Sequence, residues 1–292
     1  MENTTGILPA LVTPYDKKGN INESSLRSII RMNIKKGVSG FYVNGSTAET
    51  FLLSLEERKR LIDIVMDEVN DESTIIYHVG NISTDVAIEL AKYGEKLNVN
   101  AISAIPPFYY NFSFQEIKDY YKKINDSVNI PMVIYNFPSN SGVKMQLSDF
   151  KELMEDDRII GVKHTSMDLY ELERIKQTTN KIIFNGHDEV FLGGLAMGAS
   201  GAIGSTFNLI AEKFIKIFES FHKGEIRKAY EMQIEANNII EALVKVGVVQ
   251  GVKYGLEKSG IECNGMRTPF KLLSKEEKAY LDKVFYDNKV NF

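Results

Sequence analysis

Residues Ile159–Ser166 read IIGVKHTS, a run in which three aliphatic residues and a glycine lead directly to Lys163. Continuous apolar runs of this kind are typical of strands buried on both faces of a parallel sheet. Burying an unpaired ammonium group costs on the order of several kcal/mol, and lysine is rarely fully buried. Lys163 therefore either reaches water at the end of its strand, which is the commoner case, or it has a chemical purpose.

Seven similar short apolar runs occur in the first two thirds of the chain, and amphipathic segments separate them. Ser54 precedes Glu57, and Ser113 precedes Glu116, at the spacing of a helix-capping box. Eight strands alternating with helices predict an α/β fold, the (β/α)8 or TIM barrel. An open doubly wound sheet is the alternative, but its GxGxxG motif after the first strand is missing. The eight runs are GILPALVTP, GFYVNGS, TIIYHVG, AISAIPP, PMVIYNFP, IIGVKHTS, KIIFNGHD and GASGAIGST.

From Asn208 onward the pattern becomes entirely helical, through EKFIKIFESFHKG, EIRKAYEMQIEANNIIEALVKVG and SKEEKAYLDKVF. The first of these segments is expected to be the last barrel helix. The sequence therefore predicts a barrel over residues 1–222 and a C-terminal helical appendage over residues 223–292. The appendage is expected to pack on the barrel, so that the chain forms a single domain with a tail.

The composition is that of an ordinary globular protein: of 292 residues, 43% are hydrophobic and 25% charged, with a net charge of -4. No cluster of lysine or arginine indicates a nucleic-acid or membrane surface. No apolar run approaches the roughly 18 residues of a membrane span, and MENTTGILPA lacks the features of a signal peptide. The single Cys263 cannot form an internal disulfide. We expect a cytoplasmic protein.

Polar residues gather where five of the predicted strands end. In a (β/α)8 barrel these ends form one rim, which carries the active site. Each group also has a plain structural explanation, such as a helix cap or a solvated head group. Alternation along a strand would place Lys163 and Thr165 on one side, and Gly186 with Asp188. A metal site at His187–Glu189 is disfavoured because adjacent side chains on a strand diverge. The five groups are Asn44–Thr47, Tyr135–Asn136, Lys163–Thr165, Gly186–Glu189 and Gly204–Thr206.

A lysine in a dry pocket has a recognised use. Desolvation lowers the pKa of its ammonium group, and the neutral amine can then attack a ketone to form an imine. The protonated imine acts as an electron sink for breaking an adjacent carbon–carbon bond. A phenol such as that of Tyr135 can transfer the proton, and backbone N–H groups after Gly45 suit a substrate carboxylate. This chemistry requires no metal and no cofactor, and we expect none.

Three motifs together resemble the dihydrodipicolinate synthase and N-acetylneuraminate lyase superfamily: GSTAE, YNFP with Tyr135, and GVKHTS with Lys163. The likeness runs from Gly6 to the C-terminal helices. The resemblance implies that Lys163 forms the Schiff base and that Tyr135 transfers protons. It implies that Ser46 and Thr47 hold the pyruvoyl carboxylate, with Ser46 also orienting Tyr135. It further implies a homotetramer, in which Tyr109 is inserted from a neighbouring subunit.

Other segments are similar to the lyase branch of that family, among them SAIPPFYYNFSF, FNGHDEVFLGGLAMGASGAIGSTFN and VGVVQGVKYGL. The resemblance implies a class I aldolase that reversibly cleaves N-acetylneuraminate (sialic acid) to pyruvate and N-acetylmannosamine. Carboxylates are suitable acceptors for the several hydroxyls of the sugar tail. The residues implied to contact that tail are Thr165, Gly186, Asp188, Glu189 and Ser205.

Two positions depart from the family pattern. Ala48 stands where the family usually has glycine, so its methyl group could narrow the GSTAE loop or restrict its backbone. Asn140 stands where dihydrodipicolinate synthases usually have an arginine for a second carboxylate. Sister enzymes with the same imine chemistry stay open, namely a dihydrodipicolinate synthase or a keto-deoxy sugar-acid aldolase. A non-catalytic sugar-acid binding protein is the other alternative, but pure binding needs no nucleophile such as Lys163.

Overall fold

The computed structural model describes residues 5–292, which divide into two compact units. The central unit is Thr74–Ile203 together with Thr5, and the terminal unit combines Gly6–Ser73 with Gly204–Phe292. The predicted boundary between residues 222 and 223 separates barrel repeats from appended helices, and it stays a prediction; residues 1–4 of that barrel lie outside the described part. None of the helices in residues 5–292 is long and apolar enough to cross a membrane.

The central unit contains six parallel strands in the same order as in the sequence, each paired with the next. A doubly wound sheet would reverse its order at a switch point, so this order favours the predicted barrel. Lys163 lies opposite Tyr135 on one neighbouring strand and opposite Phe184 on the other. The strands are β3 (Thr74–His78), β4 (Ala101–Ala104), β5 (Met132–Asn136), β6 (Ile159–His164), β7 (Ile182–Asn185) and β8 (Gly201–Gly204).

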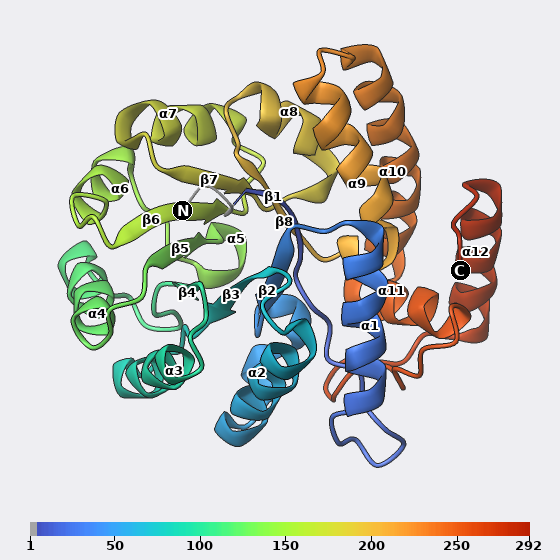
Figure 1. Ribbon diagram of the computed structural model, residues 1–292, viewed down its shortest axis with the longest axis horizontal. Helices are drawn as coiled ribbons and strands as arrows, with labels where there is room; N and C mark the ends of the chain where they lie inside the picture. The colour runs from blue at the N-terminus through green and yellow to red at the C-terminus, as the bar shows by residue number, and fades with distance from the viewer. Residues whose placement is uncertain (1–4) are drawn as a thin grey trace. The chain divides into compact units, whose positions relative to one another are not determined.

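Helices follow these strands, and in Figure 1 the longer of them lie on the outer side of the central strands. The predicted capping box of Ser113 and Glu116 begins one of them. That helix buries an apolar face that includes Ile117, Tyr121 and Ile124, as expected for a helix packed on a sheet. The helical elements are α3 (Thr84–Lys96), α4 (Phe114–Asp126), α5 (Pro138–Ser141), α6 (Leu147–Leu153), α7 (Leu169–Thr179), η3 (Asp188–Val190) and α8 (Phe191–Ala196).

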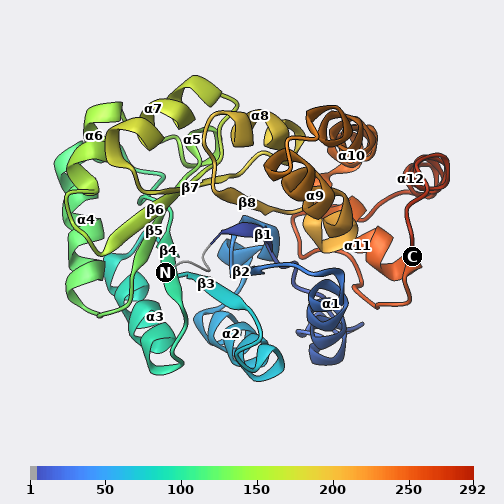
Figure 2. The ribbon, with the colours of Figure 1, turned by 45° about the horizontal axis from the view of Figure 1, so that its top comes forward.

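The terminal unit holds two more strands, joined by a parallel bridge between Ala10 and Tyr42. The predicted capping box of Ser54 and Glu57 is present here. Gly247, with φ 108° and ψ 116°, separates two C-terminal helices, the first of which packs beside α9 (Figure 2). The elements are β1 (Gly6–Pro9), α1 (Glu23–Lys36), β2 (Gly40–Val43), η1 (Ser46–Ala48), η2 (Thr50–Leu52), α2 (Leu55–Val69), α9 (Phe207–His222), α10 (Ile226–Val246), α11 (Val248–Lys258) and α12 (Lys275–Asp287).

A buried amide joins the segment after β1 to the segment after β8. Asn208 Nδ2 donates to the carbonyl oxygen of Ala10 at 2.6 Å and to that of Ser205 at 2.8 Å, and its Oδ1 accepts from Val12 N at 3.3 Å. Asn208 is fully buried, and both its amide nitrogen and its amide oxygen are hydrogen-bonded. A buried polar group left without a partner would cost roughly 1–3 kcal/mol. Asn208 thereby fixes the position at which Ser205 leaves the strand.

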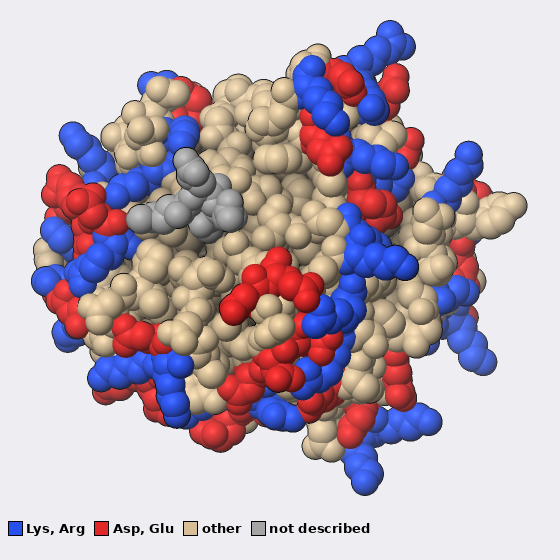
Figure 3. Space-filling view, viewed as in Figure 1, with Lys and Arg blue, Asp and Glu red and all other residues tan. Residues whose placement is uncertain are grey.

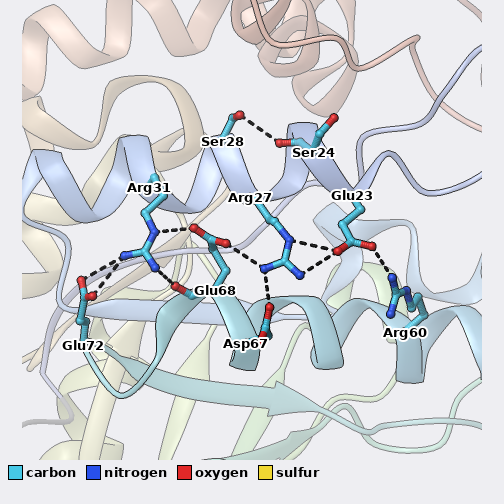
Figure 4. A network of polar contacts seen from close by, with 9 residues as sticks. All are labelled: Glu23, Ser24, Arg27, Ser28, Arg31, Arg60, Asp67, Glu68 and Glu72. Carbon is cyan, nitrogen blue, oxygen red and sulfur yellow. Dashed lines mark hydrogen bonds and ion pairs between the residues drawn. The ribbon is translucent and has the colours of Figure 1, made fainter.

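An ion-pair network joins α1 to α2 at the surface (Figure 4). Glu68 accepts hydrogen bonds from both Arg27 and Arg31, and Arg27 also reaches Glu23 at 2.7 Å. Over these two helices Figure 3 shows both signs of charge side by side. Exposed pairs contribute only about 0–1 kcal/mol each, so the network orients two neighbouring helices more than it stabilises them.

The eight strands, each followed by one or more helices, have the (β/α)8 barrel topology with a C-terminal helical extension. The predicted fold class is therefore confirmed. All eight predicted strands are present, although β1 ends at Pro9 where the apolar run continues to Pro14. The helix α11 lies in the region after Asn208 that was predicted to be helical, although it is not one of the three helical segments quoted for that region.

Candidate active site

Lys163 is the penultimate residue of β6, and its side chain is buried, with only 4% of the residue exposed. Its Nζ lies 4.1 Å from the centroid of the Tyr135 ring on the adjacent strand. Two residues earlier, Gly161 has no side chain because a Cβ there would collide with the carbonyl oxygen of Ile182. The sequence therefore lets β6 and β7 approach closely just before the lysine.

The surroundings of Lys163 disfavour its charged form. Burial lowers the pKa of Lys163 to about 7, and the Asp188 carboxylate acts in the opposite direction. Desolvation penalises an ammonium group because the protein interior solvates charge less well than water does. A substantial fraction of the Lys163 side chain is therefore the neutral, nucleophilic amine near pH 7. The strand end thus carries the group that imine formation requires.

Aromatic rings hold Tyr135 in place. The Phe137 ring is stacked on it with centroids 5.8 Å apart, and the His78 ring meets it edge-on at 5.7 Å. His78 Nε2 accepts a hydrogen bond from Ile105 N at 3.3 Å, which fixes the orientation of the imidazole. Tyr135 therefore has little freedom to turn away from Lys163. No motif around His78 in the sequence predicts its contact with Tyr135.

The residues that directly follow Tyr135 and Lys163 form a second buried pair. Asn136 and His164 directly follow Tyr135 and Lys163 and face each other across the sheet. Asn136 Nδ2 donates to His164 Nδ1 at 3.2 Å, so His164 Nε2 carries the proton that it donates to the carbonyl oxygen of Asp168. Burial lowers the pKa of His164 to about 4, so the ring is neutral at pH 7. This pair is a fixed support, because both ring nitrogens of His164 and the amide nitrogen of Asn136 have partners.

Thr165 and Gly186 fit each other closely. Thr165 is buried, and within residues 5–292 its Oγ1 has no hydrogen-bond partner. A Cβ on Gly186 would collide with that hydroxyl oxygen. Buried polar atoms in native proteins almost always have partners. The Thr165 hydroxyl is therefore available to a bound molecule, and Gly186 must lack a side chain to leave it in place.

The expected geometry after β7 was wrong. The strand ends at Asn185, and residues 188–190 form the short helix η3, so strand alternation does not relate Gly186 to Asp188. His187 Nδ1 and Glu189 Oε1 lie 3.2 Å apart. This contact raises the pKa of His187 and lowers that of Glu189. Within residues 5–292, no three His, Cys, Asp or Glu side chains are grouped to hold a metal ion.

In the terminal unit two hydroxyl groups meet. Thr47 Oγ1 and Ser205 Oγ lie 2.6 Å apart, while Ser46 is exposed. The turn η1 accommodates Ala48 without difficulty: the left-handed residues of this loop are Asn44 and Glu49, so no glycine is required at position 48. The expected restriction by the alanine methyl group is therefore absent from the backbone.

Tyr109 and Asn140 lie at the surface of the central unit. Tyr109 is 83% exposed with φ 78°, and its ring meets that of Tyr110 edge-on at 5.0 Å. Asn140 is exposed on α5. A groove of about 310 Å³ runs beside the tyrosines. A bulky residue with positive φ and an exposed aromatic ring is unusual on a surface that contacts only water.

Replacing Gly186 by alanine tests the close fit to Thr165. We expect Gly186→Ala to destabilise the protein by about 1–3 kcal/mol because the added methyl group overpacks the site. The combination Thr165→Ala/Gly186→Ala should recover part of that loss, since the colliding oxygen is gone. Thermal unfolding of the two single variants and the double variant measures the coupling. Strictly additive losses would show that the two residues do not constrain each other.

Known proteins provide an independent comparison. The model of the dihydrodipicolinate synthetase family matches residues 3–287. An N-acetylneuraminate lyase of Clostridium perfringens is 44% identical over 273 residues, which are 93% of this chain and 95% of the relative. CdNal from Clostridium difficile, solved in complex with mannosamine, is 44% identical with a TM-score of 0.95, covering 98% of this chain and 99% of its own.

A third protein, the N-acetylneuraminate lyase of Fusobacterium nucleatum, was solved with pyruvate. It is 41% identical with a TM-score of 0.93, and the match covers 98% of this chain and 97% of that protein. The range matched by the family model, residues 3–287, extends over both units and contains each of the quoted motifs. The chain belongs to the dihydrodipicolinate synthetase family and is similar to the N-acetylneuraminate lyases within it.

Proposed function

We propose that this protein is a class I aldolase that cleaves N-acetylneuraminate reversibly to pyruvate and N-acetylmannosamine. One observation carries the proposal: the buried amine of Lys163, with its pKa lowered to about 7, lies 4.1 Å from the Tyr135 ring. One N-acetylneuraminate lyase matches 93% of this chain, and another, solved with pyruvate, matches 98% of it. Pure sugar-acid binding would not need a desolvated nucleophile.

In the first step, the neutral amine of Lys163 attacks the ketone carbon of the open-chain sugar acid. Water leaves, and the product is an imine that becomes protonated on nitrogen. The positive charge then draws electrons from the neighbouring carbon–carbon bond. The same burial that lowers the pKa of Lys163 keeps competing water away from the imine.

In the second step, Tyr135 acts as its phenolate: it accepts the proton of the sugar hydroxyl at the carbon that becomes the aldehyde, and the resulting phenol later gives this proton to the enamine carbon. The carbon–carbon bond breaks, N-acetylmannosamine leaves, and pyruvate remains on Lys163 as an enamine. Protonation of the enamine carbon and hydrolysis of the imine release pyruvate and restore the amine. The rings of Phe137 and His78 hold Tyr135 for this transfer.

The remaining site residues have binding roles in the proposal. Ser46 and Thr47 bind the pyruvoyl carboxylate, and Ser46 also orients Tyr135. The Thr165 hydroxyl, which has no other partner in the described part of the chain, contacts the polyhydroxylated tail. Gly186, Asp188, Glu189 and Ser205 contact the same tail. Asn140 provides no cation for a second substrate carboxylate, which favours a sugar acid over an amino-acid semialdehyde.

Trapping with borohydride tests the nucleophile. After brief incubation with pyruvate and reduction, peptide mass spectrometry should find the adduct on Lys163. The initial rate of adduct formation should rise with pH through about pH 7 and then level off. Above that pH the Lys163 side chain, whose pKa is lowered to about 7, is already mostly neutral. Lys163→Met should abolish the adduct and pyruvate release from N-acetylneuraminate, whereas the exposed control Lys223→Met should not. An adduct on another lysine would contradict the assignment.

The Tyr135→Phe variant tests the proton transfer. This change keeps the ring and its packing but removes the hydroxyl. We expect kcat for N-acetylneuraminate cleavage to fall by roughly 10²–10⁴-fold, the usual contribution of a general acid–base group. Trapping of pyruvate on Lys163 should persist, since imine formation uses the amine. Turnover within a few-fold of the unaltered protein would remove Tyr135 from the mechanism.

We also propose a cytoplasmic homotetramer in which Tyr109 reaches a neighbouring subunit. The exposed, left-handed Tyr109 and the adjacent groove support this proposal, as does the burial of the single, unpaired Cys263 for a reducing compartment. Light scattering should give the mass of four chains, and Tyr109→Ala should weaken that assembly because an aromatic anchor is lost. A monomer at micromolar concentration would contradict the tetramer.

A further inference from the structure

The terminal unit contains a second lysine in apolar surroundings. Lys253 on α11 has a side chain that is 1% exposed, and its partner Glu49 has one that is fully buried. Lys253 Nζ donates to Glu49 Oε1 at 2.5 Å and to the carbonyl oxygen of Gly265 at 2.7 Å. The Tyr15 ring lies 4.4 Å from the same nitrogen. This ion pair is buried away from water, and the ammonium group of Lys253 contacts a carboxylate, a carbonyl oxygen and an aromatic ring.

Glu49 has an unusual backbone for its residue type. Its φ of 61° and ψ of 34° lie in the left-handed region, which side chains other than glycine, asparagine and aspartate rarely adopt. Such a conformation persists only where the surroundings determine it. Here both carboxylate oxygens are held, because Oε2 accepts a hydrogen bond from Arg267 N at 2.8 Å. The buried carboxylate therefore fixes the backbone of its own loop.

Arg267 Nη1 makes two further hydrogen bonds, one to the loop of residues 46–52 and one to the helix that follows it. Arg267 Nη1 donates to the carbonyl oxygen of Leu52 at 3.0 Å and to Glu57 Oε2 at 2.7 Å, at the start of α2. Glu49 N donates to the carbonyl oxygen of Ser46 at 3.0 Å, so the held residue is bonded directly to the serine. The position of residues 46–52 thus depends on α11 and on residues 265–267.

We propose that Glu49 and Lys253 are positioning residues, which hold Ser46 and Thr47 where they bind the substrate carboxylate. This inference rests on the proposed function, in which those hydroxyl residues bind that group. A well-packed apolar pair would stabilise a fold as well as a buried ion pair does. An apolar pair would lack the three directed hydrogen bonds that the side chains of Glu49 and Lys253 make with each other, with the carbonyl oxygen of Gly265 and with Arg267 N. Precise placement matters for binding groups, because small displacements weaken the interaction strongly.

The concentration dependence of pyruvate trapping on Lys163 tests the proposal. In Lys253→Met, the pyruvate concentration that gives half-maximal adduct should rise about tenfold or more, since the carboxylate-binding loop is displaced. At saturating pyruvate, the rate of adduct formation in this variant should stay within about threefold of that of the unaltered protein, because the amine of Lys163 is unaltered. A change that merely reduced the folded fraction would lower the amount of adduct and leave the half-maximal concentration unchanged.

Two further variants complete the experiment. Lys253→Met leaves an uncompensated buried carboxylate, so Glu49→Gln/Lys253→Met, which removes both charges, is measured beside it; its half-maximal concentration should also rise. The matched control is Lys258→Met on the same helix, because Lys258 pairs with Asp282 at 3.1 Å at the surface. That control should bind pyruvate as the unaltered protein does.

The outcomes separate this inference from the proposed function. If the unaltered protein forms no adduct on Lys163, the proposed function fails. If it forms the adduct and both Lys253 variants show an unchanged half-maximal concentration, the proposed function stands and the positioning role is overturned. An equal rise in the Lys258→Met control would also overturn it, because any damage to α11 would then have the same effect.

Discussion

The proposed chemistry depends on the desolvation of one ammonium group at the end of β6. Lys163 is buried beside Tyr135, and its pKa is lowered to about 7 although the Asp188 carboxylate acts against that shift. Closely packed neighbouring strands make this environment possible, since Gly161 lets β6 and β7 approach. A more polar pocket would favour the charged, unreactive lysine. The surrounding residues therefore act by excluding water as much as by direct contact.

A comparison within the chain shows how the lysine proposed as nucleophile differs from a lysine held in an ion pair. The tripeptide Gly-Val-Lys ends at Lys163 on a strand and again at Lys253 on a helix. Burial lowers the pKa of both side chains. At Lys253, however, Glu49 lies 2.5 Å away and supplies the compensating charge. The proposed nucleophile and the ion-paired lysine therefore differ in whether a carboxylate lies beside the ammonium group. The short local sequence does not reveal this difference.

Features of the fold and the site that depend on local sequence could be predicted, whereas those that depend on contacts between distant residues could not. Runs such as IIGVKHTS predicted the strands, and the capping boxes at Ser54 and Ser113 predicted helix starts, because both signals are local. The neighbourhood of Lys163 and Tyr135 followed from strand order. The geometry after β7 did not, because η3 replaces an expected strand extension. The Glu49–Lys253 pair joins positions 204 residues apart, although a lysine within VGVVQGVKYGL was a usable signal.

The most direct test of the central claim is a titration of the Lys163 side chain itself. The chain would be labelled with carbon-13 at lysine Cε, the Lys163 resonance assigned by its absence in Lys163→Met, and its shift followed by NMR from pH 5 to 11. We expect a midpoint at about pH 7. A midpoint near the ordinary lysine value of 10.5 would show that the ammonium group is not desolvated, and it would contradict the role of burial in making Lys163 a nucleophile.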